Sequence, residues 1–384
     1  MTQRSIPAVF MRGGTSKAVM FHRRDLPAER AAWDEIFLAA MGSPDPQGRQ
    51  LDGMGGGVSS LSKVCVLAPS DRPDADIDYT FAQVLIREPR VDYRSNCGNM
   101  SSAVGPFAVD EGLVAAAGEA ARVRIFNTNT HKLIHATFPV RQGRARYGGD
   151  LAIPGVSGTG APIRLDFLNP GGATTGRLLP TGQVLDRLDV PGLGPIAVSL
   201  VDAANACAFV RAGDLGLTGR ELPDEIEARP DILARLAAIR IQASLAMGIA
   251  ASEEEARDST AVPYIGFVAP AADAMALSGE AVPATAIDVM ARIVSNGQPH
   301  RALPITASLC IAVAARLAGS LVAQALGGAV PGERLRIGMP SGVLTVGADV
   351  GHDASGAWEA RSGSFYRTAR RLFDGRVYLP EVAP

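Results

Sequence analysis

The feature that most constrains the fold of this 384-residue chain is a repeat between its two halves. Three segments of the first half match three segments of the second half in the same order, which favours a duplication over a chance alignment of apolar strands. Each half therefore predicts a strand, a loop of small residues, several strands, a buried helix, and a further strand and turn. The matched segments are 9–20 with 199–210, 96–105 with 305–314, and 123–134 with 335–346.

The repeat predicts an α+β fold with two pseudo-symmetric domains, each with a sheet wrapped around one buried helix. The helices expected over 97–111 and 306–318 are apolar on nearly every face, as is typical of a helix inside a domain. We expect the first domain over 1–190, completed by the C-terminal segment 365–384, and the second over 191–364. Both helices are expected to start near a cleft between the domains, where their N-termini suit a carboxylate.

Composition narrows the classes of function that the chain can have. The net charge of −2 argues against a large nucleic-acid surface. No apolar run reaches the ~18 residues of a membrane helix, and the N-terminal sequence lacks the apolar core of a signal peptide. The four cysteines are scattered without CxxC spacing, so we expect no metal site and a reduced, cytoplasmic protein.

Two glycine-rich loops carry cations and hydroxyl groups, "MRGGTSK" at 11–17 and "DGMGGGVSSLSK" at 52–63. Neither has the spacing of a nucleotide-binding loop, because the first lacks the GxxxxGK[ST] pattern and the second is followed by a strand. Their backbone N–H groups, hydroxyls and charges suit a small polycarboxylate. Tight turns with solvated lysines are the alternative for either loop alone.

A cysteine and a lysine are the candidates for proton transfer. Taken alone, Cys97 is most simply a small buried apolar residue. At the start of a helix its thiolate would be stabilised, and Lys63, desolvated in a cleft, would be a usable neutral amine. An acid and a base on opposite sides of a substrate can move a proton between carbons. Cys65 and Cys310 fit a packing role, whereas Cys207 is undecided.

Several of these segments resemble the PrpF family, which groups 2-methylaconitate cis–trans isomerases, 4-oxalomesaconate tautomerases and 3-methylitaconate Δ-isomerases. The resemblance covers most of the chain and is strongest over 9–113. It rests on "FMRGGTSK", "MGSPDPQGRQLDGMGGGVSSLSKV", "DYTFAQV", "NCGNMSSAVGPFAVDEGLV" and "RTARRL". The family implies a diaminopimelate-epimerase-like fold, with mostly antiparallel curved sheets or partial barrels. It also implies a proton shift on an unsaturated di- or tricarboxylate, without cofactor or metal.

By motif, the resemblance implies that Lys63 and Cys97 are catalytic, and that the turn 339–342 contributes from the second domain. The sequence departs from the wider fold in one respect, because the repeat pairs Cys97 with Thr306 and not with a second cysteine. It also has Ala18 where the family commonly has glycine. The predicted substrate-binding residues are Arg12, Gly13, Gly14, Thr15, Ser16, Lys17, Ser62, Asn96, Gly98, Asn99, Thr306, Met339, Ser341 and Gly342.

Two other functions are compatible with parts of this pattern. An amino-acid racemase or epimerase of the same fold needs two opposed thiols, which Thr306 argues against. A non-catalytic carboxylate-binding protein would not bring Lys63 and Cys97 together. The expected partner is a small polycarboxylate substrate, with no nucleic acid and no membrane, in a homodimer.

Overall fold

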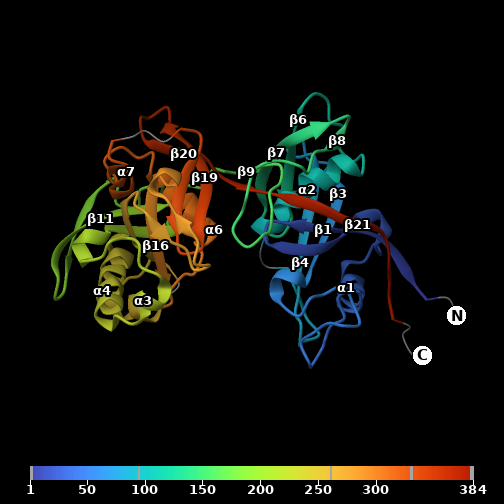
Figure 1. Cartoon of the computed structure of the whole chain (residues 1–384), viewed down its shortest axis with the longest axis horizontal. Coiled ribbons are helices and arrows are strands. Elements are labelled where there is room, and N and C mark those ends of the chain that lie inside the picture. Colours follow the sequence, from blue (N-terminus) through green and yellow to red (C-terminus); the bar gives the residue numbers. More distant parts are fainter. Residues whose placement is uncertain (1–2, 94–95, 260–261, 329–331, 381–384) are drawn as a thin grey trace. The chain divides into compact units, whose positions relative to one another are not determined.

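The computed structural model describes residues 3–93, 96–259, 262–328 and 332–380. The chain divides into two units, Met1–Asp166 with Tyr366–Pro384, and Phe167–Phe365 (Figure 1). Strands β9 (Ile163–Leu168) and β20 (Trp358–Arg367) carry the chain from one unit to the other. The boundary expected at residue 190 falls at the end of β10 (Asp186–Val190), inside the second unit.

The first unit is a mostly antiparallel sheet with a helix on each face. Within it β1 pairs with β2 and β21, β3 with β4, and β6 with β7, all antiparallel, while the pairs β2–β3 and β4–β6 are parallel. Figure 1 shows β21, drawn in red, running beside β1, drawn in blue. The bounds are β1 Ser5–Gly13, β2 Ser16–His22, α1 Trp33–Met41, β3 Lys63–Pro69, β4 Ile77–Val84, β5 Val91–Asp92, α2 Gly98–Asp110, β6 Ala120–Asn127, β7 Lys132–Arg141, β8 Arg144–Ala145 and β21 Ala369–Tyr378.

The second unit repeats the same order of strands, helix and pairings. Strands β11–β12, β13–β16 and β18–β19 are antiparallel pairs, and β12–β13 and β16–β18 are parallel pairs. This agreement confirms the internal repeat predicted from the sequence. The bounds are β11 Gly194–Asp202, β12 Ala206–Arg211, α3 Pro223–Glu227, α4 Pro230–Ala246, α5 Glu253–Asp258, β13 Tyr264–Pro270, β14 Ala274–Met275, β15 Ala281–Val282, β16 Val289–Ser295, β17 Gln298–Pro299, α6 Ile305–Ala314, α7 Leu321–Ala325, β18 Leu335–Met339 and β19 Gly342–His352.

The predicted central helices are confirmed as α2 and α6. Residues 100–109 of α2 and 307–314 of α6 are buried without a break, although both helices carry serines. The serines satisfy their hydroxyl groups on the helix itself, as when Ser102 Oγ donates to Asn99 O (2.7 Å) and Ser308 Oγ to Ile305 O (2.8 Å). Apolar and small side chains on every face thus let a sheet surround each helix, which confirms the α+β class.

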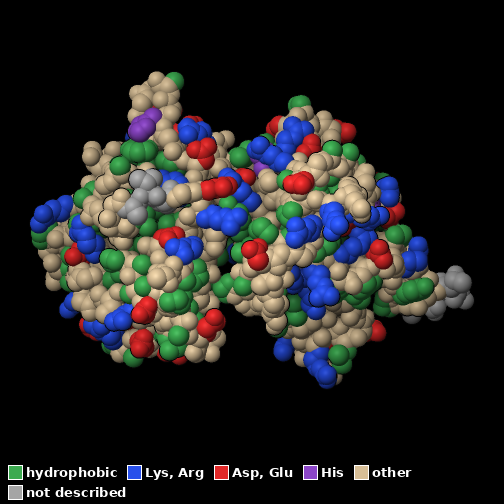
Figure 2. Space-filling model, turned by 45° about the horizontal axis from the view of Figure 1, so that its top comes forward, with side chains coloured by type: hydrophobic (Ala, Val, Ile, Leu, Met, Phe, Trp, Pro, Cys, Tyr) green, Lys and Arg blue, Asp and Glu red, His purple; other side chains and the backbone are tan. Residues whose placement is uncertain are grey.

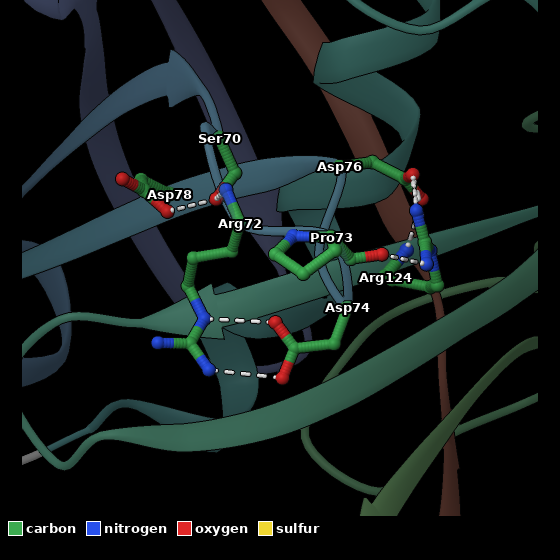
Figure 3. Close-up of polar contacts among 7 residues, drawn as sticks. All are labelled: Ser70, Arg72, Pro73, Asp74, Asp76, Asp78 and Arg124. Atoms are coloured by element: carbon green, nitrogen blue, oxygen red, sulfur yellow. Dashed lines mark hydrogen bonds and ion pairs between the residues drawn. The ribbon is translucent and has the colours of Figure 1, made fainter.

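An arginine–aspartate pair occurs at the same place in both units. In the first, Arg124 on β6 donates its backbone N–H to Asp76 Oδ2 (2.8 Å) and its guanidinium to Oδ1 (2.7 Å) (Figure 3). In the second, Arg336 on β18 binds Asp288 through the same atoms. Both partners are 212 positions further along the chain (288 against 76, and 336 against 124). The pair therefore fixes the parallel strands β4–β6 and β16–β18 in the same register.

The surface carries charges of both signs (Figure 2), and the helices are not of the membrane-spanning kind among the described residues. Lysine and arginine side chains lie among aspartates and glutamates over the face shown in Figure 2. Within the described ranges, none of the helices is both long and apolar enough to cross a bilayer.

Candidate functional site

The N-terminal end of α2 is the first component of the site. Cys97 is the residue before the helix, with an extended backbone (φ −104°, ψ 99°), and its carbonyl accepts the first helical bond from Ser101 N (2.9 Å). Cys97 is partly exposed, whereas the helix behind it is buried. The first N–H groups of a helix, here from Gly98 onward, have no partner within it. They can therefore stabilise negative charge beside the Cys97 thiol.

Asn96 holds the segment in front of the helix in place. Its Oδ1 accepts hydrogen bonds from Ser101 Oγ (3.2 Å) and from Asn127 Nδ2 (3.1 Å). Asn127 is fully buried at the end of β6, and its own Oδ1 binds the turn through Thr130. Asn96 therefore positions Cys97 from the strand side, which is a structural role for a residue that was predicted to bind substrate.

The alternation of side chains along β3 determines where Lys63 points. Val64 and Val66 pack in the apolar cluster that includes α1. Lys63 and Cys65 must then lie on the opposite face of the strand, the face that α2 contacts. Lys63 is 7% exposed at the first position of β3. The lysine is therefore presented, nearly buried, on the same side of the sheet as α2.

Cys65 shows that the lysine and the helix start lie near one another. Its thiol is fully buried, with Sγ 3.9 Å from the hydroxyl of Tyr79. Burial is the main cause that raises the pKa of Cys65; the neighbouring Cys97 raises it further, and the neighbouring Lys63 acts in the opposite direction. Lys63 and Cys97 are therefore both near enough to the Cys65 thiol to influence its ionisation.

The hairpin between β1 and β2 packs directly on the first turn of α2. Asn99 Nδ2 donates to Thr15 Oγ1 (3.0 Å). A Cβ atom added to Gly13 would lie 2.6 Å from Asn99 O, and one added to Gly14 only 2.2 Å from Asn99 Oδ1. Only glycine allows this approach, which explains the pair of glycines in the loop. Ser16, the first residue of β2, is buried.

The segment 366–369 closes this arrangement from the C-terminal part of the chain. Arg367 Nε donates to Asn99 Oδ1 (3.1 Å), and Thr368 O accepts from Gly14 N (2.9 Å). Burial lowers the pKa of Arg367 to about 10. The sequence analysis did not select this arginine, although it begins the "RTARRL" motif. A cation at the start of α2 is therefore supplied from a position far along the chain.

The two cations of the first glycine-rich loop are arranged differently from the prediction. Lys17 and Val19 are two residues apart on β2, so their side chains point to the same face of the strand, the face toward α1. The Nζ atom of Lys17 lies 5.6 Å from the centre of the Phe10 ring. It is therefore on the opposite face from Lys63. Arg12 Nη1 donates to two carbonyls, Gly14 O (2.9 Å) and Thr368 O (2.8 Å), and so binds the hairpin itself.

Ser62 also serves the backbone. It is fully buried, donates from Oγ to Val84 O (2.9 Å) and accepts from Gln50 Nε2 (2.7 Å). These bonds fix the end of the second glycine-rich loop immediately before Lys63.

The predicted residues of the second unit lie near the start of α6. Met339 and Gly342 form the last pair of the β18–β19 hairpin, and Met339 Sδ accepts from Leu303 N (3.5 Å) just before the helix. Ser341 Oγ is buried and has no hydrogen-bond partner among the described residues. The helix is preceded by Pro304, so matching the two helices by their first turns pairs Cys97 with Pro304 and places Thr306 two positions later. The second unit therefore has a proline, and no thiol, at the residue before its central helix.

The two cysteines of the second unit are both fully buried. Cys310 is buried one turn inside α6, with Sγ 3.4 Å from Val201 O, and Cys207 is buried on β12 beside it. No group of three or more metal-ligating side chains is found in the part of the chain that the structure describes.

Comparison with known proteins adds independent evidence. A family model described as "PrpF protein" matches residues 3–380. The 3-methylitaconate isomerase of Eubacterium barkeri is 43% identical over 382 residues, 99% of this chain and 98% of that protein. The 2-methyl-aconitate isomerase of Cupriavidus necator is 40% identical over 391 residues, 98% of each chain. A crystal structure of methylitaconate-delta-isomerase superposes with a TM-score of 0.90 at 43% identity, covering 99% of this chain and 96% of the other.

Proposed function

Because this chain belongs to the PrpF family, we propose that it is an isomerase that shifts a proton, and with it a double bond, on a small unsaturated di- or tricarboxylate. The observation that supports the proposal is that Lys63, nearly buried at the first position of β3, is on the face of the sheet that α2 contacts, and that Cys97 directly precedes α2. An amine and a thiol can supply the base and the acid that such a shift requires.

The mechanism follows from the arrangement of these groups. Lys63 removes a proton from the carbon α or γ to a carboxylate, and the resulting charge spreads into a dienolate. The N–H groups at the start of α2 stabilise that charge as it forms, because they are fixed in place before the reaction. Cys97 returns a proton at the other allylic carbon, or at the same carbon after rotation about a bond. In this scheme the lysine is the base and the thiol the acid.

The substrate is proposed at the level of a class. Relatives named for methylitaconate and methylaconitate match this chain at 43% and 40% identity, so the comparisons support both types nearly equally. Each of these compounds, like oxalomesaconate, carries at least two carboxylates and a carbon–carbon double bond. Arg367 beside Asn99 is the cation that we assign to one of the carboxylates.

A racemase of the same fold is less well supported. Two-base racemisation by thiols needs a second cysteine at the start of the second central helix. Pro304, Ile305 and Thr306 occupy that turn, and Cys310 is buried inside the helix. A proton shift between carbons, with unlike acid and base, agrees better with this asymmetry. A cytoplasmic location, a homodimer and independence of cofactors stay predictions.

The test is a panel of unsaturated di- and tricarboxylates incubated with the protein in deuterium oxide and followed by proton NMR. We expect new olefinic signals together with deuterium at the allylic carbons. Lys63→Ala and Cys97→Ala should each reduce kcat by several orders of magnitude while thermal unfolding stays cooperative. Lys132→Ala, at an exposed position, and Cys207→Ala are the matched controls. Turnover near that of the wild type in either active-site variant contradicts the proposal.

A further inference from the structure

Gln83 lies directly opposite Lys63 in the antiparallel pair β3–β4. Its Oε1 accepts a hydrogen bond from Lys63 Nζ. Its Nε2 donates to two backbone carbonyls, Ser59 O (3.0 Å) and Ser62 O (2.9 Å). Both N–H donors of this side-chain amide are therefore engaged by the loop that leads into β3, and its oxygen is engaged by the first residue of β3.

These bonds leave the amide one orientation. A primary amide has two N–H donors and one carbonyl acceptor. Turning it over would place the carbonyl oxygen against the oxygens of Ser59 and Ser62 and lose both hydrogen bonds. The oxygen is thus held toward Lys63, where it can only accept. One N–H bond of the lysine is then directed at Gln83, whatever the protonation state of the amine.

The backbone that anchors Gln83 is itself well fixed. Ser62 O, which accepts from Gln83 Nε2, also accepts from Val84 N (3.1 Å), and Ser62 Oγ donates to Val84 O (2.9 Å). On the same face of β4, two residues before Gln83, Phe81 places its ring centre 5.0 Å from Lys63 Nζ. The amine is therefore held between an amide oxygen and an aromatic ring, both carried by β4.

We propose that Gln83 is the positioning residue for Lys63: it directs one N–H bond of the amine at itself and leaves the remaining positions on the nitrogen for the substrate. A neutral acceptor does this without the full negative charge that would hold the lysine as an ammonium ion. The choice of glutamine over glutamate or aspartate therefore suits a lysine that must lose its proton to work as a base. This inference rests on the proposed function for the role of Lys63 but not for the contact itself.

The chain offers a direct measurement, because Lys17, Lys63 and Lys132 are its three lysines. Protein labelled with 13C at the lysine ε carbons gives three signals, and Lys63→Arg identifies the one that belongs to Lys63. The signal is titrated with pH in the wild type, in Gln83→Glu and in Gln83→Leu. Gln183→Glu, which adds the same charge at an exposed position of the second unit, is the matched control.

In Gln83→Glu the titration midpoint of Lys63 should move up by one pH unit or more, because a carboxylate replaces the amide beside the amine. The ascending limb of kcat/KM against pH should move by the same amount, so that activity at pH 7 falls about tenfold and recovers at higher pH. Gln83→Leu, which cannot accept a hydrogen bond, should lower kcat tenfold or more with KM within threefold of the wild type. The control should change neither quantity.

A purely structural role for Gln83 would give a different pattern. Activity would fall in both variants in proportion to lost thermal stability, with no movement of the midpoint or of the pH limb, and that result overturns the inference. The titration does not need turnover. If the wild type turns over none of the carboxylates, the proposed function fails while the midpoint still reports on Gln83. If the wild type is active, Lys63→Ala is inactive and the midpoint in Gln83→Glu does not move, the inference alone fails.

Discussion

The contact between the β1–β2 hairpin and α2 can be tested with a single methyl group. Gly13 has no unusual backbone conformation, so alanine is sterically allowed there except for what its Cβ would meet. That atom would lie 2.6 Å from Asn99 O and 3.1 Å from Met100 Cα, which are backbone atoms of the first helical turn. The hairpin must therefore move away from α2 by roughly 0.8 Å to reach an ordinary contact of 3.4 Å.

This displacement sets the expected size of the effect. Overpacking of this kind typically costs about 1–3 kcal/mol, which for a unit of this size lowers the Tm by roughly 2–4 °C per kcal/mol. A misplacement near 1 Å in a catalytic site costs about 10²-fold in rate. We therefore expect Gly13→Ala to lower the Tm by several degrees and kcat/KM by about two orders of magnitude.

The assay is thermal unfolding followed by circular dichroism, with turnover measured by NMR on the same preparation. Gly148→Ala is the matched control, because a Cβ atom at Gly148 meets nothing within 4 Å. A Gly13→Ala protein whose Tm is within 1 °C of the control, and whose kcat/KM is within twofold of it, would refute the argument that the hairpin must touch α2 for the site to work.

Two further predictions follow from the described contacts. Burial opposes ionisation of Asp76 and Asp288, but the hydrogen bonds from Arg124 and Arg336 outweigh it and lower the pKa of both carboxyls. Their contribution to stability is therefore present above the unfolded pKa near 3.8 and is lost as the pH falls through the lower folded values. The Tm difference between the wild type and the Asp76→Asn/Asp288→Asn protein should thus shrink between pH 6 and pH 3, and a constant difference would contradict the assignment. Lys17 lies on the α1 face, so Lys17→Ala should keep kcat/KM within threefold. Ser16, its neighbour on β2, points to the opposite face, toward α2, so Ser16→Ala should lower kcat/KM at least tenfold. Equal losses in the two variants would show that the faces are assigned wrongly.

Local signals in the sequence predicted the elements that depend on neighbouring residues. The helix α2 and its polar start at Cys97 follow from an asparagine and glycine placed before an apolar run, and the structure has them there. The repeat predicted that both halves share one topology, because equal patterns of strands and turns produce equal pairings. The PrpF resemblance is confirmed by the family match over residues 3–380.

What sequence reasoning missed depends on pairing between distant segments. Gln83 reaches Lys63 only through the register of β3 with β4, and Arg367 reaches Asn99 across 268 positions of the chain. The cations and hydroxyl residues of "MRGGTSK" were treated as one group because they are close in sequence. In a strand, however, neighbouring side chains point to opposite faces, and which face receives α2 cannot be known before the fold is. Lys17 and Ser16 were therefore grouped although the strand separates them.

The two units also differ in a way that bears on the chemistry. They share the arginine–aspartate pair to the atom, so the contacts that hold the parallel strands are the same in both. At the first position of β3 the first unit has Lys63, and at the first position of β13 the second unit has Tyr264, whose hydroxyl is hydrogen-bonded by Thr306. Burial, followed by the nearby Cys207, raises the pKa of Tyr264. The second unit thus has an uncharged pair where the first has an amine and a thiol. Under the proposed function, a duplicated fold that keeps its framework in both halves but the amine and the thiol in one is suited to moving a proton between two carbons with unlike acid and base, and not to exchanging protons between two equivalent thiols.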